Sequence, residues 1–414
     1  MKMTVIRTSL RKKITRSVLS AAALIGTAAG VLFLYPLVPE ISALFIPVRS
    51  QTGEMTRIAN MNDTAMVLFE PVEPESVSVQ EPVNDAVYEQ QVPEPVPELT
   101  VKEFPGKYIR TYNRFEMNED VSAFTVHSGR IVEETFTRGN GPEYIELSGG
   151  AQVRNCTDLD NSAVMNICSV MPDIAVEMYS DEPQVLILHT HTTESYEPYT
   201  KDWYDEQYTS RSSDPENGVV AVGDAIAEQL ASAGISVIHD CTIHDEIYTG
   251  AYARSLSTAV SVLDMYPSVK VVLDIHRDAI EYSDGSRVSA VTEIDGKKAA
   301  QVMIICAADD GNYDVPDFYN NLHFACGLQQ SMETLFPTLT RPVLFQYCQY
   351  NQQISHGALL IEVGSHGNSI DEAVYSGELI GKALAELLAV NAAKEPETIP
   401  VMAGMPLYFL ERVR

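Results

Sequence analysis

The chain has 414 residues and a formal net charge of −29 at pH 7. This length exceeds one usual domain, so we expect one large domain, a smaller one and non-globular sequence beside them. Nucleic-acid binding is driven by basic patches that release counterions from phosphates. No basic stripe follows residue 50, so the charge argues against a nucleic-acid partner.

The N-terminus predicts a membrane anchor. A basic tail, residues 1–16, precedes an uncharged apolar stretch, residues 17–39. A helix of about 20 apolar residues can cross the hydrocarbon layer. Basic residues before this stretch, with none immediately after it, predict a cytoplasmic N-terminus and an extracytoplasmic remainder. The alternative is a cleaved secretory signal, whose apolar core would be shorter. We therefore expect a single-pass protein of the cell membrane.

Two segments separate this anchor from the largest domain. Residues 50–105 are rich in Pro, Glu, Val and Gln, as in EPVEPESVSVQEPV. Repeated proline with mutually repelling carboxylates keeps a chain extended, which predicts a linker. Residues 106–181 change to short alternating runs such as EYIELSGG, ended by Gly, Asn or Asp. That pattern predicts a small β-rich domain.

The segment 183–393 alternates apolar strands with amphipathic helices, a pattern typical of an α/β domain. Strands are expected at 185–188, 235–238, 269–275 and 358–363, and helices at 219–233, 252–265, 318–336 and 371–388. Two runs that flank Asp295-Gly296 predict a β-hairpin, 288–294 with 299–307. We expect a three-layer sandwich with a mainly parallel sheet flanked by helices. A C-terminal tail, 394–414, follows and holds the apolar patch MPLYFL.

The six cysteines are even in number, and none forms a CxxC pair of a metal site. An exported chain can form disulfides, and Cys156 with Cys168 is the closest pair along the sequence. The sequence alone does not decide any bridge. Cys306 lies in the apolar run MIICA, which predicts a buried free thiol.

Three segments place imidazole or carboxylate groups at the ends of apolar strands: LILHTHTTES, VVLDIHRDA and LLIEVGSHGN. The carboxyl ends of strands line the ligand crevice in open α/β sheets, so these side chains can meet. His191 and Glu194 have an HxxE spacing, and His276 ends the second strand. Two histidines with a glutamate are a common ligand set of catalytic zinc. We therefore predict that His191, Glu194 and His276 bind Zn²⁺.

Glu362 lies inside the apolar run LLIEVGS, where a carboxylate is costly to bury without a partner. A zinc hydrolase needs a group that takes a proton from the attacking water and returns it to the leaving amine. Glu362 fits that catalytic role. The alternative is a structural ion pair with a buried cation, for which Arg277 and Arg254 are candidates. For His276 the alternative is a core histidine satisfied by a backbone carbonyl.

Five segments together resemble the stage II sporulation protein P family: LHTHTTESY, NGVVAVGDAIAEQLASAGISVIHD, AYARS, VVLDIHRDA and IEVGSHGN. The resemblance covers roughly residues 183–393. It implies a fold like that of zinc amidases and carboxypeptidases, and a peptidoglycan N-acetylmuramoyl-L-alanine amidase that also cuts peptide crosslinks. The implied process is septal wall degradation and engulfment during sporulation. The competing functions are a stem-peptide endopeptidase or carboxypeptidase and a non-catalytic wall-binding module.

The same resemblance implies partners and residue roles. The implied partners are peptidoglycan, a stage II sporulation protein D-like lytic transglycosylase and a membrane protein. The family's metal positions match His191, Glu194 and His276, and its catalytic glutamate matches Glu362.

Two of these assignments keep an alternative. Strand residues alternate, so His189 and His191 face the same side and either can be the ligand. We favour His191 for its spacing to Glu194, with His189 supporting the ligands or contacting substrate. Related amidases place their glutamate further along the chain, which makes Glu216 the alternative to Glu194.

Three further residues are predicted to contact substrate: Arg277, His366 and Asn368. A guanidinium group pairs well with a carboxylate, so Arg277 is expected to clamp the stem peptide. Its alternative is an ion pair with Asp278 or Asp274. His366 and Asn368 closely follow Glu362 and are expected to line the cleft. By contrast, the histidines at 239 and 244 follow a different strand and are expected on the surface or in the core.

Overall fold

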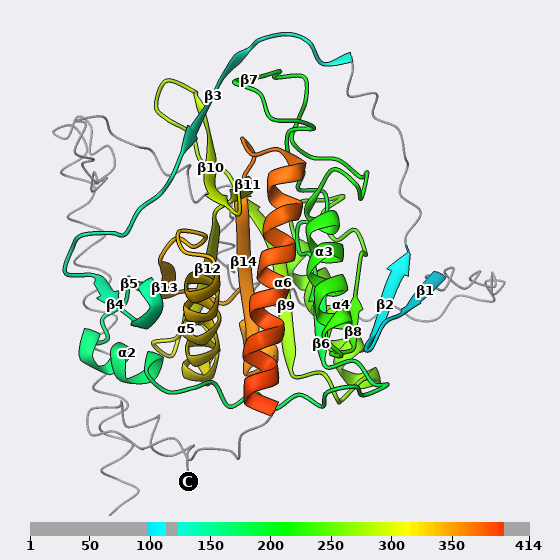
Figure 1. Ribbon diagram of the computed structural model, residues 1–414, viewed down its shortest axis with the longest axis vertical. Coiled ribbons are helices and arrows are strands. Elements are labelled where there is room, and N and C mark those ends of the chain that lie inside the picture. The colour runs from blue at the N-terminus through cyan, green and yellow to red at the C-terminus, as the bar shows by residue number, and fades with distance from the viewer. Residues whose placement is uncertain (1–97, 113–122, 393–414) are drawn as a thin grey trace, which may run out of the picture. The chain divides into compact units, whose positions relative to one another are not determined.

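The computed structural model describes residues 98–112 and 123–392 (Figure 1). The predicted anchor, nearly all of the linker and the C-terminal tail lie outside these described residues. Among the described helices, none combines the length and the apolar character that a membrane crossing requires.

A ten-stranded sheet carries the fold, in the order β1-β2-β8-β6-β9-β14-β12-β13-β5-β4. The strands are β1 (Glu98–Glu103), β2 (Lys107–Tyr112), β4 (Tyr144–Glu146), β5 (Gln152–Asn155), β6 (Val185–Leu188), β8 (Val237–His239), β9 (Val271–Asp278), β12 (Val302–Ala308), β13 (Val343–Tyr347) and β14 (Gly357–Ser365). Neighbours are parallel except for β1–β2, β12–β14 and β4–β5. The predicted mainly parallel sheet is confirmed.

Helices cover both faces of this sheet (Figure 1). They are α2 (Asn161–Cys168), α3 (Val219–Ser232), α4 (Ala251–Met265), α5 (Phe318–Leu335) and α6 (Ile370–Ala392). Alternate residues of β6 face opposite layers, because strand side chains alternate. Val185 and Ile187 join the core under α3, α5 and α6, whereas Leu186 and Leu188 join the core under α4. The fold thus has the predicted helix–sheet–helix layering.

Helices α3 and α6 approach each other closely through glycine. A Cβ added at Gly377 would lie 2.8 Å from the carbonyl oxygen of Val222, and one added at Gly381 would lie 2.9 Å from that of Ile226. Real Cβ atoms do not come this close to backbone, so the two glycines set the spacing of the helix pair.

A second, four-stranded sheet has the order β11-β10-β3-β7. Its strands are β3 (Gly129–Glu134), β7 (Trp203–Tyr204), β10 (Arg287–Ile294) and β11 (Lys297–Ala300). The predicted hairpin is present, and Asp295 and Gly296 have φ of 51° and 75°, as a type I′ turn requires. The run expected as one returning strand is divided, because β11 pairs with β10 while β12 enters the large sheet.

The segment 106–181 does not build a β-rich domain of its own. Strand β2 pairs with β8 at one side of the large sheet, and β5 pairs with β13 near the other. Strand β3 pairs with β10 in the four-stranded sheet. The alternating pattern correctly indicated strands, and β4 pairs locally with β5. However, β2, β3 and β5 each also pair with a strand more than 100 residues away, which no local pattern reveals.

A disulfide joins Cys168 at the end of α2 to Cys326 in α5, with Cα atoms 5.3 Å apart and a sequence separation of 158. Cys156, the nearest cysteine in sequence to Cys168, is free and exposed. Cys306 is buried and free, which confirms the prediction made for it.

Candidate functional site

Three neighbouring strands, β6, β9 and β14, bring the predicted site residues together toward the carboxyl ends of these strands. Strand β9 lies between β6 and β14. His276 on β9 pairs directly with Glu362 on β14, so their side chains lie on the same face. Strand β6 ends at Leu188, opposite Asp274 of β9, and the HTHTTES loop follows at once.

Glu194 and His276 contact each other. The His276 Nδ1 atom lies 3.4 Å from Glu194 Oε2, and both side chains are buried. Glu194 Oε2 also accepts the backbone N–H of Arg277 at 3.2 Å. On the other side of the ring, His276 Nε2 lies 2.9 Å from Asp274 Oδ1. The two atoms are at ion-pair distance, but their alignment is not that of a hydrogen bond. Carboxylates commonly stand behind the histidine ligands of metals.

Opposite charges shift the titration of this buried pair. Burial opposes ionisation of Glu194, but the hydrogen bond and charge of His276 outweigh it and lower the pKa of the carboxyl. Burial also disfavours the imidazolium of His276, but Asp274 and Glu194 raise its pKa well above the usual value. Two carboxylates, those of Glu194 and Asp274, therefore flank the His276 ring.

His191 lies beside this pair with unused nitrogens. Its ring is perpendicular to that of His276, with centroids 5.4 Å apart, and stacks on Tyr248 at 4.7 Å. Neither ring nitrogen has a hydrogen-bond partner among the described residues, and Nδ1 is 3.9 Å from Asp245 Oδ2. Burial lowers the pKa of His191 to about 4, so the ring is neutral. A neutral, buried and unpartnered imidazole is a suitable metal ligand.

The predicted ligand set fits zinc by its chemistry, since it combines a neutral histidine, a second histidine backed by a carboxylate and an ionised glutamate. The ligand atoms of these three residues are not all within 4.8 Å of one another. Within the described part of the chain, Asp224, His239 and Cys241 meet that spacing instead. To bind one ion together, the side chains of His191, Glu194 and His276 must therefore come closer to one another than they lie here.

Glu362 is buried, and its Oε2 atom has no hydrogen-bond partner among the described residues. Burial and the neighbouring Asp278 carboxylate raise its pKa to about 8, against the opposing charges of His276 and Arg341. Within the described part of the chain, no ion pair is formed by this carboxyl group. It therefore keeps the proton-accepting capacity that a catalytic base needs.

Neither arginine considered as a structural partner of Glu362 forms an ion pair with it. The Arg277 guanidinium donates to the carbonyl oxygens of Ser195 at 2.9 Å and Ser210 at 2.8 Å. Arg254 donates to the carbonyl oxygen of His244 at 2.7 Å. Both arginines hold loops in place, so the structural alternative for Glu362 finds no support here.

His189 has both ring nitrogens engaged. Nδ1 lies 2.9 Å from the carbonyl oxygen of Ile275, and Nε2 lies 2.8 Å from His239 Nε2. Burial and the positive charge of His239 lower the pKa of His189 to about 3. The neutral ring therefore donates a hydrogen bond from Nδ1 to the carbonyl oxygen of Ile275, and its Nε2 accepts a hydrogen bond from Nε2–H of His239. This geometry favours His191 over His189 as the metal ligand.

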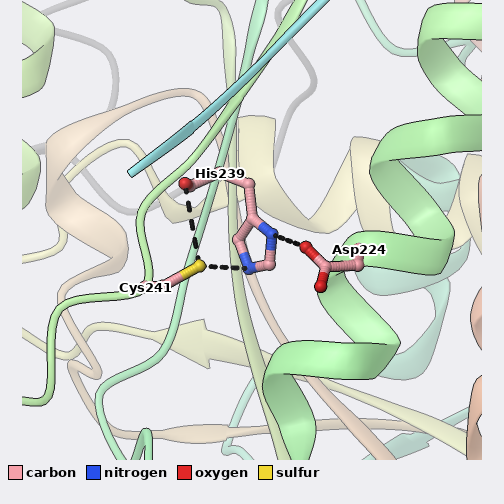
Figure 2. A group of neighbouring side chains, drawn as sticks. All are labelled: Asp224, His239 and Cys241. Atoms are coloured by element: carbon pink, nitrogen blue, oxygen red, sulfur yellow. Dashed lines mark hydrogen bonds and ion pairs between the residues drawn. The ribbon is translucent and has the colours of Figure 1, made fainter. Parts of the chain in front are cut away.

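Behind His189, a buried polar network continues through His239 to Asp224 (Figure 2). His239 Nδ1 lies 2.9 Å from Asp224 Oδ1, which also accepts from Arg110 Nε at 2.8 Å. Burial disfavours the charged form of His239, but Cys241 and Asp224 raise its pKa to about 10. An imidazolium at this position donates from both nitrogens, to Asp224 and to His189.

The same network contains the residue types of a metal site. Figure 2, however, shows the His239 ring standing between Asp224 at Nδ1 and Cys241 at Nε2, where Sγ is 3.7 Å away. A zinc ion bound by one ring nitrogen lies about 2 Å from it and cannot also reach the donor on the far side of the ring. We therefore interpret this group as a hydrogen-bonded network. No sequence motif indicated it, because its members come from separate elements.

The family model described as Stage II sporulation protein P (SpoIIP) matches residues 103–385. The chain belongs to the stage II sporulation protein P family. The match begins near β2, well before the start at 183 that the motifs indicated, in agreement with the integration of β2 into the large sheet. A family member from Bacillus subtilis (strain 168), stage II sporulation protein P, is 27% identical over 229 residues. The alignment covers 51% of this chain and 54% of the relative, so the chain spans about half the length of that curated protein.

The chain resembles solved amidase structures only distantly. The CwlD amidase from Clostridioides difficile, in complex with the GerS lipoprotein, is 14% identical with a TM-score of 0.32, covering 50% of this chain and 99% of that one. The catalytic domain of CwlV from Bacillus (Paenibacillus) polymyxa var. colistinus is 12% identical with a TM-score of 0.28, covering 50% and 99%. Likenesses this low decide nothing about chemistry.

Two other predicted site residues, Glu216 and Asn368, have a structural role or lie outside the site. Glu216, the alternative metal ligand, is exposed in a turn where its backbone N–H donates to Asp214 at 3.0 Å. Asn368 is fully buried; its Oδ1 accepts the N–H of Ser365 at 2.9 Å and its Nδ2 donates to Glu372 at 2.9 Å. The amide therefore stabilises the turn after β14 and has no atom left for substrate.

His366 and Arg277, the remaining predicted substrate contacts, are both buried. His366 Nε2 lies 3.0 Å from Glu281 Oε1. Burial lowers the pKa of His366 to about 4, although Glu281 acts in the opposite direction. The Arg277 guanidinium is occupied by backbone carbonyls rather than by Asp278 or Asp274 carboxylates. Its carboxylate-clamp role stays a prediction without support from the geometry.

Proposed function

We propose that this chain is a zinc-dependent peptidoglycan hydrolase that cleaves the amide between N-acetylmuramic acid and the L-alanine of the stem peptide. We further propose that it acts in septal wall degradation and engulfment during sporulation. The observation that carries the catalytic proposal is the direct pairing of Glu362 on β14 with His276 on β9, with Glu362 Oε2 buried and unpartnered. Membership of the stage II sporulation protein P family supports the biological setting.

His191, Glu194 and His276 would hold the zinc ion, which would act as a Lewis acid toward the scissile carbonyl. Asp274 lies against Nε2 of His276, and Nδ1 of the same ring faces Glu194. Arg277 stabilises the position of Glu194 through its backbone N–H, while its guanidinium fixes the Ser195 and Ser210 loop segments.

Glu362 moves the proton in this proposal. As base, its carboxylate takes a proton from the attacking water; as acid, it returns that proton to the nitrogen of the leaving L-alanine. A group serves both steps best when its pKa lies near the working pH. Burial and Asp278 raise the pKa of Glu362 to about 8, and a bound cation nearby would lower it from there.

The setting of the reaction is also a proposal. The apolar stretch 17–39 and the basic tail before it support a single-pass anchor in the cell membrane with an extracytoplasmic catalytic domain. Peptidoglycan is the substrate and partner. By family resemblance we add a stage II sporulation protein D-like lytic transglycosylase and a membrane protein as further partners.

A digest of purified peptidoglycan with and without chelator, followed by metal analysis of the protein, tests this function. We expect free lactyl groups on the glycan and intact stem peptides, lost on chelation and restored by Zn²⁺. Cleaved peptides still attached to glycan would mean an endopeptidase or carboxypeptidase. Wall binding with no released product would mean a non-catalytic wall-binding module.

A further inference from the structure

Tyr252 lies in the first turn of α4, against both predicted histidine ligands. Its ring is parallel to that of His276 with centroids 6.5 Å apart, and perpendicular to that of His191 with centroids 5.7 Å apart. Tyr350 packs on the same ring at 5.4 Å. The tyrosine thus forms a wall of the candidate site, but it neither holds the ion nor moves the proton in the proposed reaction.

The backbone around Tyr252 is firmly held. Its carbonyl oxygen accepts a hydrogen bond from Asn351 Nδ2 at 2.9 Å and another from Ser255 Oγ at 3.1 Å. Since Asn351 follows β13 in sequence, this contact ties the start of α4 to a loop from another part of the sheet. The ring is therefore held in place, and its position is not that of a mobile surface side chain.

The phenol hydroxyl contrasts with the rest of the residue. Its oxygen is buried and has no hydrogen-bond partner among the described residues. A buried hydroxyl without a partner costs about 1–3 kcal/mol. Packing of the ring does not explain this cost, because phenylalanine would pack equally well and avoid it. The hydroxyl is therefore suited to a partner that arrives with the substrate.

We propose that the Tyr252 hydroxyl is a catalytic hydrogen-bond donor to the carbonyl oxygen of the scissile amide. When water adds to the carbonyl carbon, the carbon–oxygen double bond becomes a single bond and the oxygen gains negative charge. A donor already in position stabilises that charge without reorganisation. Tyr252 keeps its own proton throughout, while Glu362 handles the proton of the water. This inference rests on the proposed amidase function.

Tyr252→Phe removes the hydroxyl and keeps the ring. We expect kcat on peptidoglycan fragments to fall by about 10²–10³, the usual effect of losing one such donor. KM should change little, because the bond strengthens only as the oxygen becomes charged. Bound zinc per protein should equal that of the wild type. Tyr266→Phe, at the other end of the same helix, is the matched control and should retain wild-type kcat.

Two results would overturn the inference. An unchanged kcat in Tyr252→Phe would show that the hydroxyl has no part in the reaction. Loss of zinc in that variant would show that the hydroxyl serves the metal or the fold instead. Failure of the proposed function is distinguishable, because the wild type itself would then release no stem peptide and Glu362→Gln would behave like it.

Discussion

Glu362 is the residue on which the proposed chemistry turns, and its surroundings exert opposing effects. Burial and Asp278 favour the protonated carboxyl group, while His276 and Arg341 favour the carboxylate. Arg341 is largely engaged elsewhere, since its Nη2 atom lies 2.9 Å from Asp278 Oδ2. The balance leaves a carboxyl group able to gain and lose a proton near neutral pH.

We therefore expect Glu362→Gln to lower turnover by about 10²–10⁴ while retaining bound zinc, because glutamine cannot transfer the proton. His276→Ala should lose both activity and metal, since it removes a predicted ligand. Release of stem peptides and metal content per protein are the two measurements. A Glu362→Gln protein with most of its activity intact would refute the assigned role.

His323 in α5 offers a test of buried-histidine energetics away from the site. Burial lowers its pKa to about 4, whereas a histidine in the unfolded chain titrates near 6.5. Between these two values the unfolded chain binds a proton that the folded chain does not. The free energy of unfolding is therefore expected to fall as the pH drops from 6.5 to 4.

In His323→Gln this dependence should weaken by up to ~1.4 kcal/mol per pH unit, the value for one proton. Urea unfolding of the metal-free protein at several pH values between 4 and 6.5 measures it, with wild type as the reference. Parallel curves for wild type and variant would contradict the assigned cause.

At this scale the sequence indicates what is local. Glu194, marked by the HxxE spacing, lies beside His276, and Glu362, the glutamate inside an apolar strand, pairs with His276. His191 does not reach ligand spacing with Glu194 and His276, and the roles of these residues stay predictions. The choice between His189 and His191 depends on His239, a residue 50 positions away from His189. Strand alternation makes those two histidines equivalent, so only the tertiary structure separates them.

At the scale of elements, the packing of α3 against α6 depends on glycine. A methyl group at Gly377 would lie 2.8 Å from the carbonyl oxygen of Val222 and 3.1 Å from the Cβ of Ala225. The nearest atom belongs to backbone, so relief requires the helices to move apart and weakens the core beneath them.

Gly377→Ala is expected to destabilise the protein by about 1–3 kcal/mol, as overpacking does, although alanine favours helix. Lys382→Ala, on the exposed side of α6, is the control and should have little effect. The midpoint of denaturant unfolding measures both. A Gly377→Ala protein as stable as wild type would mean that the two helices can separate without loss.

Long amphipathic helices were the most predictable elements, because each carries several turns of the same apolar pattern. Expected and observed bounds agree within one residue for the start of α3 and α4. Strand β13 escaped prediction, since its five residues have no distinctive alternation and follow a proline. Its place in the sheet comes from pairing with β12 and β5, which are remote in sequence.

Across the whole molecule, the disulfide between Cys168 and Cys326 closes a loop that contains four strands of the large sheet, β6, β8, β9 and β12. A crosslink over a separation of 158 residues restricts the unfolded chain strongly. Reduction should therefore lower the free energy of unfolding by about 2–4 kcal/mol. The double variant Cys168→Ser, Cys326→Ser should match the reduced wild type and show no response to reductant. Thermal unfolding of both proteins with and without reductant decides this, and a reductant-insensitive wild type would contradict it.

The outer strands of the large sheet have a consequence for how the chain folds during synthesis. Strands β1, β2, β4 and β5 all lie between Glu98 and Asn155, yet β8 and β13, which β2 and β5 must join, begin at Val237 and Val343. Ribosomes deliver the early strands first. Strands β2 and β5 can pair at once with β1 and β4, but their other edges stay open until later sequence emerges. Unpaired strand edges are prone to aggregation. Newly made molecules therefore pass through a vulnerable interval, during which a chaperone that shields the early strands would raise the yield of folded protein.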